Sequence, residues 1–180
     1  MEKHSIQVFE PSGPPEDDVL DRNLQALRTA GFEVEYTPWQ VDARVRLEVE
    51  GVRARLGQIQ SVLNGNYPYL LSARGGYGAS DIVGRLDWQT LAQSPAKVLI
   101  GFSDVSALQS AIFTRLGWPS LHAPMPGSSF ISEARLEFLL RGVLPARRSR
   151  ADCSGPPGPA HRWGRRAAAH RELAHCPRLA

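Results

Sequence analysis

The chain has 180 residues, 42% of them hydrophobic and 22% charged, which is the composition of a globular protein with room for one sizeable core. Its net charge of +3 conceals a division, because residues 1–140 carry 12 Lys and Arg against 16 Asp and Glu, whereas residues 141–180 carry 9 Arg against 2 acids. The acidic body argues against a nucleic-acid-binding face, and no apolar run is long enough for a transmembrane helix.

Two kinds of segment alternate along the chain. Some are short and apolar or alternate between apolar and polar residues, as strands do, and in the others the apolar residues recur at helical spacing. The predicted strands are residues 5–9, 32–36, 69–73, 97–100 and 118–122. The predicted helices are one opened by Ser12 or Pro14 and closed by Gly31, and then residues 52–63, 79–86, 89–93, 105–116 and 133–140. Residues 39–51 fit neither pattern and are left as an irregular or short extra element. Strands that alternate with helices at this pitch predict an α/β fold with a doubly wound, mostly parallel sheet.

The character of the sequence changes after Leu144. Residues 145–180 are rich in Arg, Ala, Pro and Gly with hardly any periodic apolar position, so we predict a folded domain over residues 1–144 followed by an irregular, disordered tail. So abrupt a change suggests a frameshift or an unrelated extension. Both cysteines, Cys153 and Cys176, lie in the tail near three histidines, but their spacing favours unpaired thiols over a zinc site.

Two strand ends near the middle of the chain carry residues suited to chemistry. The third predicted strand runs into Arg74-Gly75-Gly76-Tyr77-Gly78, and the fourth runs into Gly101-Phe102-Ser103-Asp104. The carboxyl ends of parallel strands meet at one edge of a sheet, where open α/β proteins bind their ligands. We therefore expect the two turns to lie side by side at that edge.

Ser103 is the candidate nucleophile. A serine on a sharp strand-to-helix turn has a strained backbone and an exposed hydroxyl, although Val105 stands where the usual motif has a second glycine. The backbone N–H of Asp104 and an N–H of Gly75 or Gly76 are candidate donors to an oxyanion. The alternative is that Ser103 and Asp104 only cap the helix that follows.

The glycine-rich turn leaves several interpretations open. It does not fit G-x-G-x-x-G or the P-loop, but it can still cradle an anion at a helix N-terminus. Arg74 suits a bidentate pair with a carboxylate or is an exposed arginine at a strand end, and we count it with Gly75 and Tyr77 as candidate substrate-binding residues. His122, at the end of the fifth predicted strand, is either a general base or a structural histidine.

These turns also resemble a known family. The strings SARGGYGAS at residues 72–80, LDW at 86–88 and IGFSDVSAL at 100–108 resemble the LD-carboxypeptidases, serine peptidases that include muramoyltetrapeptide carboxypeptidases and microcin C self-immunity peptidases. Pro11-Ser12-Gly13-Pro14 and His122-Ala123-Pro124-Met125 resemble the family as well, in the expected order. The resemblance covers roughly residues 5–142.

The resemblance implies a flavodoxin-like or class I glutamine amidotransferase-like sheet and a serine carboxypeptidase. Such an enzyme removes the terminal D-alanine of murein tetrapeptide by cutting an L,D bond in peptidoglycan recycling. Ser103 would be the nucleophile, and the main chains of Asp104 and Gly76 would hold the oxyanion. No cofactor or metal is implied. The expected partner is a murein peptide or a related small, microcin-like peptide, with no membrane and no specific nucleic acid.

The start of the chain lacks a basic segment followed by an apolar one, so we expect no signal peptide and a cytoplasmic protein. Members of the family carry the Glu and His of their triad in a second, C-terminal domain, and residues 145–180 do not resemble it. We therefore expect a nucleophile-bearing half with little or no peptidase activity alone, whose uncovered face favours association into a homodimer. The alternatives are a module that binds a small anionic ligand without hydrolysis and a basic tail that binds nucleic acid.

Overall fold

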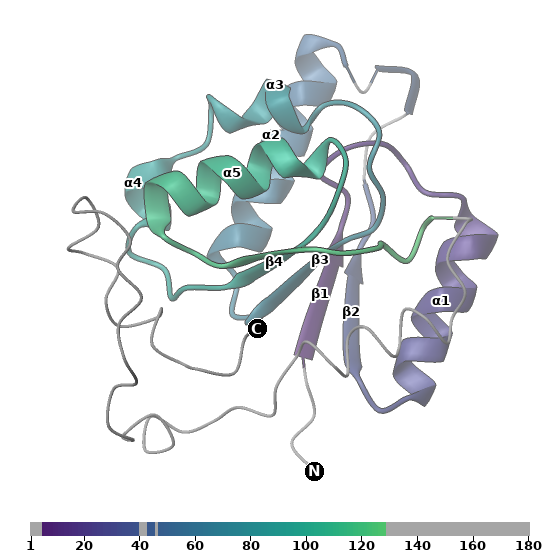
Figure 1. Cartoon of the computed structure of the whole chain (residues 1–180). Helices are drawn as coiled ribbons and strands as arrows, with labels where there is room; N and C mark the ends of the chain where they lie inside the picture. The colour runs from purple at the N-terminus through teal and green to yellow at the C-terminus, as the bar shows by residue number, and fades with distance from the viewer. Residues whose placement is uncertain (1–4, 40–42, 46, 129–180) are drawn as a thin grey trace, which may run out of the picture. The chain divides into compact units, whose positions relative to one another are not determined.

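The computed structural model describes residues 5–39, 43–45 and 47–128, which form a five-stranded parallel sheet with helices (Figure 1). The strand order is β2-β1-β3-β4-β5, and each pair of neighbours is parallel. The strands are β1 (Ser5–Phe9), β2 (Glu33–Thr37), β3 (Tyr69–Ser72), β4 (Val98–Gly101) and β5 (Ser120–His122). This is the doubly wound, flavodoxin-like order, and it confirms the predicted fold class.

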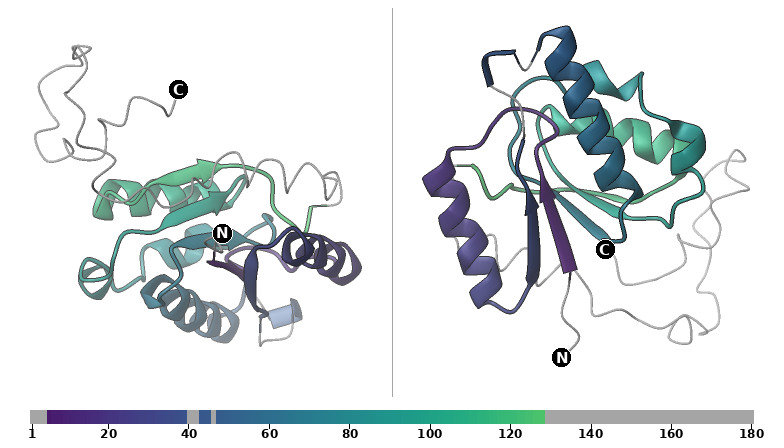
Figure 2. Two further views of the ribbon diagram at one scale, coloured as in Figure 1. Left: turned by 90° about the horizontal axis from the view of Figure 1, so that it is seen from below. Right: turned by 180° about the vertical axis from the view of Figure 1, so that it is seen from behind.

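The helices divide between the two faces of the sheet. They are α1 (Asp17–Thr29), the 3-10 helix η1 (Ala43–Val45), α2 (Val49–Asn64), α3 (Ala79–Val83), α4 (Trp88–Leu91) and α5 (Val105–Leu116). Ile6, Leu71 and Ile100 pack with α1 on one face, while the alternating Leu70 and Leu99 pack with α2, α3, α4 and α5 on the other. Figures 1 and 2 show α1 separated from these helices by the strands.

The start of α1 corrects a prediction. Neither Ser12 nor Pro14 opens the helix, which begins at Asp17 with Glu16 in extended conformation at the N-cap (φ −82°, ψ 119°). The reason is a long-range contact, because the backbone N–H of Gly13 donates to the carbonyl of Gly75 at 2.9 Å. The residues between β1 and α1 are therefore held as a loop at the carboxyl edge of the sheet.

Other boundaries differ from the predicted ones by one to three residues, which is the usual uncertainty of element ends. The helix expected from Val52 begins at Val49, inside the segment left unassigned, and the helix expected over 79–86 ends at Val83. The helix expected at 133–140, the boundary at residue 144 and the cysteine- and histidine-bearing tail lie outside the described residues. None of the helices in the described part is long and apolar enough to cross a membrane.

Candidate active site

Three loops meet at the carboxyl edge of the sheet, beside the switch point between β1 and β3. Residues 74–78, the glycine loop, lie between the loop that follows β1 and the turn that follows β4. The carbonyl of Gly75 accepts the hydrogen bond from Gly13, and a Cβ at Gly75 would lie 3.1 Å from Cβ and 3.3 Å from Oγ of Ser103. A side chain there would be crowded against Ser103, so the loop backbone passes directly beside the serine.

Ser103 lies in the sharp turn between β4 and α5, and its side chain is exposed. Its φ of +64° is in the left-handed region, where no other non-glycine residue of the described part is found. Such a conformation costs on the order of 1–3 kcal/mol for a non-glycine residue and is concentrated at functional sites. The backbone thus holds the hydroxyl of Ser103 out at the sheet edge, which is the geometry of a nucleophile on a strand-to-helix elbow.

The N–H of Asp104 points out of the N-terminal end of α5. The carbonyl of Ser103 accepts a hydrogen bond from the N–H of Ser106 in the first turn of that helix, at 2.9 Å. Because the C=O and N–H of a trans peptide unit point in opposite directions, the Asp104 N–H is directed away from the helix body. The positive end of the helix dipole adds to its attraction for an anion.

The N–H of Gly76 is a second candidate donor. Gly76 has a φ of +124°, and a Cβ on it would lie 3.1 Å from both N and Cα of Gly13. Since the carbonyl of Gly75 points at Gly13, the N–H of the same peptide unit points away from the β1 loop. Neither this N–H nor that of Asp104 donates a hydrogen bond to any residue in the described ranges.

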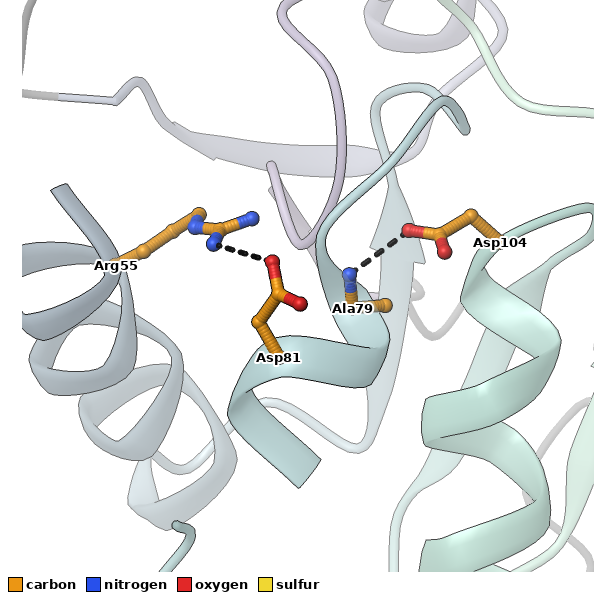
Figure 3. Close-up of polar contacts among 4 residues, drawn as sticks. All are labelled: Arg55, Ala79, Asp81 and Asp104. Atoms are coloured by element: carbon orange, nitrogen blue, oxygen red, sulfur yellow. Dashed lines mark hydrogen bonds and ion pairs between the residues drawn. The ribbon is translucent and has the colours of Figure 1, made fainter. Parts of the chain in front are cut away.

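The carboxylate of Asp104 does not cap its own helix. Although Asp104 is the N-cap residue of α5, its side chain makes no capping bond there. Its Oδ2 accepts instead from the backbone N–H of Ala79, the first residue of α3, at 2.8 Å (Figure 3). Asp104 therefore occupies the N-cap position of α5 without a side-chain capping bond, and its side chain joins two loops of the site.

Two exposed side chains stand at the rim of the glycine loop. Arg74 donates one hydrogen bond from Nη1 to the carbonyl of Pro14 at 2.9 Å, which leaves other guanidinium N–H groups for a ligand. Tyr77 is 75% exposed, so its ring presents a large apolar surface beside the turn. Both positions are compatible with contact to a bound peptide.

His122 ends β5 and is exposed. Its ring packs edge to face against Phe102, with 5.9 Å between the ring centroids, and Phe102 directly precedes Ser103. Within the described residues no hydrogen bond joins the imidazole to Ser103. The structure therefore places His122 next to the turn that carries Ser103.

Sequence reasoning missed Arg55, a fully buried side chain in α2. Its Nη2 lies 3.5 Å from Oδ2 of Asp81 in α3 (Figure 3). A signal was present, because Arg55 falls on the same apolar stripe of the helix as Val52 and Ile59. A charged residue on such a stripe indicates a buried, specific contact.

The segment that follows β5 entered the sequence analysis only through its resemblance to the LD-carboxypeptidase family. It also forms part of the carboxyl edge of the sheet. The N–H of Gly127 donates to the carbonyl of Ala73 at 2.7 Å, and the amide of Asn23 in α1 donates to the carbonyl of Pro126 at 2.6 Å. Met125 is buried and would be 3.4 Å from a Cβ placed on Gly75. This segment therefore packs against the glycine loop.

Comparison with known proteins agrees with the motifs. Residues 6–123 match the family described as the LD-carboxypeptidase N-terminal domain. The chain is 35% identical over 143 residues to a Streptomyces coelicolor protein named as a carboxypeptidase, which covers 77% of this chain and 46% of that relative. It is 32% identical over 121 residues to the murein tetrapeptide carboxypeptidase of Pseudomonas aeruginosa, with 67% and 39% covered. The chain thus spans less than half the length of these relatives.

Solved structures share the fold at lower identity. The structure of MccF in complex with glutamyl sulfamoyl guanosine has a TM-score of 0.66 and 20% identity, covering 83% of this chain and 47% of that one. The MccF-like protein from Bacillus anthracis has a TM-score of 0.64 and 22% identity, covering 78% and 44%. With its parallel sheet and glycine loop inside the region that the family match spans, the chain belongs to the LD-carboxypeptidase family.

Proposed function

We propose that this chain is the nucleophile-bearing part of a cytoplasmic serine carboxypeptidase. The enzyme removes the terminal D-alanine of murein tetrapeptide by cutting an L,D bond in peptidoglycan recycling. One observation carries the proposal: Ser103 is exposed in a left-handed backbone conformation directly beside the glycine loop. Family membership and the relative named for murein tetrapeptide support the reaction and the substrate.

The reaction follows from the groups around Ser103. Its Oγ attacks the carbonyl carbon that precedes the terminal D-alanine, and the N–H groups of Asp104 and Gly76 stabilise the negative charge on the carbonyl oxygen. Collapse of this intermediate breaks the C–N bond and releases D-alanine. Water then attacks the acyl-enzyme, releases the shortened peptide and regenerates Ser103.

A base must take the proton of Ser103 and return it to the leaving amine. Family resemblance implies a histidine oriented by a glutamate in a second domain, and none of the described residues makes a hydrogen bond that would supply this role. A serine without its base keeps only the part of catalysis given by binding and the oxyanion site, on the order of a thousandfold over water. We propose that residues 1–180 alone have little turnover.

The rim residues give the substrate its orientation in this proposal. A tetrapeptide that ends in D-alanine carries a free carboxylate next to the bond to be cut. The guanidinium of Arg74, with donors left after its bond to Pro14, pairs with that carboxylate. Tyr77 packs against the peptide, and the glycine loop leaves room for the scissile carbonyl.

The proposal is tested by grafting residues 5–123 in place of the matching segment of the Pseudomonas aeruginosa relative. Release of D-alanine from murein tetrapeptide is then measured by chromatography. We expect activity from the graft, a loss of at least about a thousandfold with Ser103→Ala, and little change with the matched control Ser106→Ala in the same turn. A folded graft that binds the tetrapeptide without releasing D-alanine would favour the ligand-binding module instead.

A further inference from the structure

The glycine loop is held against Ser103 by two charged side chains from outside it. We propose that the carboxylate of Asp104, supported by the guanidinium of Arg55, positions this loop and thereby sets the oxyanion site. The proposal rests on the proposed function, because the placement of the loop affects rate only if an oxyanion forms beside Ser103. The backbone N–H of Asp104 and its carboxylate have separate tasks here, since the first donates to the substrate and the second is a positioning group.

The Asp104 carboxylate connects the two turns directly. Asp104 follows the nucleophile, and Ala79 follows the last residue of the glycine loop. The 2.8 Å bond from the Ala79 N–H to Asp104 Oδ2 therefore joins the elbow to the loop across 25 positions of sequence. Hydrogen bonds to an ionised acceptor are roughly twice as strong as neutral ones, so this contact is a firm restraint.

Arg55 supports the same end of the loop from the other side, as Figure 3 shows. Gly78 has a φ of +118°, and a Cβ placed on it would lie 1.8 Å from Nη1 of Arg55. The guanidinium thus packs directly against the backbone of Gly78, and its ion pair with Asp81 anchors it to α3. The first turn of α3 is consequently fixed between Arg55 and Asp104.

These restraints matter because the loop itself is permissive. Gly76 and Gly78 both have positive φ, and glycine explores such conformations with little cost. Only Tyr77 and Gly78 separate Gly76 from the N–H that Asp104 holds. If that bond is lost, the Gly76 N–H keeps the restraint of the hydrogen bond between Gly13 and Gly75 but loses the one on its other side. A displacement of about 1 Å relative to Ser103 can cost on the order of a hundredfold in rate.

The test uses the whole chain with Asp104→Ala and Asp104→Asn, which both keep the backbone N–H of residue 104. Two quantities are measured: hydrogen exchange of the Ala79 and Gly76 amides by NMR, and the rate constant for labelling of Ser103 by a fluorophosphonate. In D104A we expect Ala79 exchange to rise at least about tenfold and labelling to slow about ten- to a hundredfold. In D104N the amide oxygen accepts the same bond. We therefore expect its Ala79 exchange rate and its labelling rate constant to lie within about threefold of those of the unmodified chain.

Asp87→Ala is the matched control. Asp87 caps α4 by accepting from the N–H of Thr90 at 3.0 Å, as Asp104 accepts from the first N–H of α3. In the described part of the chain Asp87 makes no hydrogen bond to either turn of the site. We expect D87A to leave Gly76 exchange and Ser103 labelling unchanged. Asp104→Leu, close to Asn in shape and without an acceptor, replaces D104A if the smaller side chain prevents folding.

Folded D104A or D104L protein with unchanged exchange at Ala79 and Gly76 would overturn the positioning role. Failure of D104N to restore exchange would overturn it as well. Absence of labelling in the unmodified chain is consistent with the missing base, so the failure of the proposed function is read from the grafted enzyme instead. The exchange measurements then still decide whether Asp104 holds the loop.

Discussion

The carboxyl edge of the sheet has two halves, and polar residues are exposed on one and buried on the other. At the ends of β3 and β4, Ser103 is exposed on a left-handed turn and the N–H groups around it face outward. At the ends of β1 and β2, Glu10 is only 6% exposed. Its carboxylate accepts hydrogen bonds from the hydroxyl of Tyr36 and, at 3.2 Å, from the N–H of Trp39.

Both arrangements lower the stability of the fold, but by different routes. The left-handed serine costs conformational strain, and the buried carboxyl costs solvation that two hydrogen bonds only partly replace. On the β1–β2 half the Glu10 carboxylate is buried and paired with Tyr36 and Trp39 inside the fold. On the β3–β4 half the polar groups are left open to a substrate, so accessible polar groups, rather than polarity itself, mark the site.

The largest effect is expected from adding a side chain to the glycine loop. Gly78→Ala places a Cβ 1.8 Å from a guanidinium nitrogen and forces a φ of +118° on a residue that resists it. We expect the free energy of unfolding to fall by about 3 kcal/mol, from strain and overpacking together. Urea unfolding followed by circular dichroism measures this.

The control for that variant is Gly84→Ala, at the C-cap of α3. Its φ is −70°, and a Cβ there would meet nothing within 4 Å. We expect its stability to stay within about 0.5 kcal/mol of the original or to rise slightly. Equal losses of unfolding free energy in the two variants would show that Arg55 moves aside for the methyl group and does not hold the loop in place.

The elements with strong local signals were predictable from the sequence. The helix from Val105 to Leu116 has the predicted ends, because Gly117 closes it in the left-handed conformation with a φ of 69°. The parallel sheet followed from the alternation of strands and helices, and the juxtaposition of the two turns followed from the sheet. These predictions depend on neighbours in the chain or on general rules of chain topology.

The contacts that refine the site depend on residues far apart in sequence. The bond between Asp104 and Ala79, the packing of Arg55 on Gly78 and the pairing of Gly13 with Gly75 all require the tertiary fold. Local patterns even favoured the wrong partner for Asp104, because an aspartate before a helix usually caps that helix. The same long-range pairing kept Ser12 and Pro14 out of α1.

A smaller and opposite effect is expected at Ser103 itself. Ser103→Gly relieves a left-handed conformation that costs about 1–2 kcal/mol, while glycine adds about 0.5–1 kcal/mol of unfolded-state entropy. We expect a net gain of about 1 kcal/mol in the free energy of unfolding together with complete loss of fluorophosphonate labelling. Ser103→Ala, which keeps the strain, should lose labelling without that gain. If the two variants unfold at the same urea concentration, the turn holds no strain.

On the β1–β2 half, the loss of stability caused by the buried Glu10 carboxylate depends on pH. Burial raises the pKa of Glu10, although hydrogen bonds from Tyr36 and Trp39 lower it, and the Asp17 carboxylate adds to the rise. Burial and the neighbouring Glu10 also raise the pKa of Tyr36, which therefore remains a hydrogen-bond donor. A carboxyl whose pKa is higher in the folded state binds its proton more tightly there. Its contribution to stability is full below the unfolded pKa, near pH 4, and is lost as the pH rises through the folded pKa.

Glu10→Gln keeps the acceptor oxygen and removes the ionisation. We expect the variant and the original to have nearly equal Tm values below about pH 4 and the variant to gain as the pH approaches neutrality. Glu35→Gln, on an exposed position of β2, changes the net charge equally and should show no such divergence. If the two Tm curves for residue 10 stay parallel from acid to neutral pH, the hydrogen bonds from Tyr36 and Trp39 fully replace water around the carboxylate. The two halves of the edge would then differ in strain alone, because only Ser103 would lower the stability of the fold.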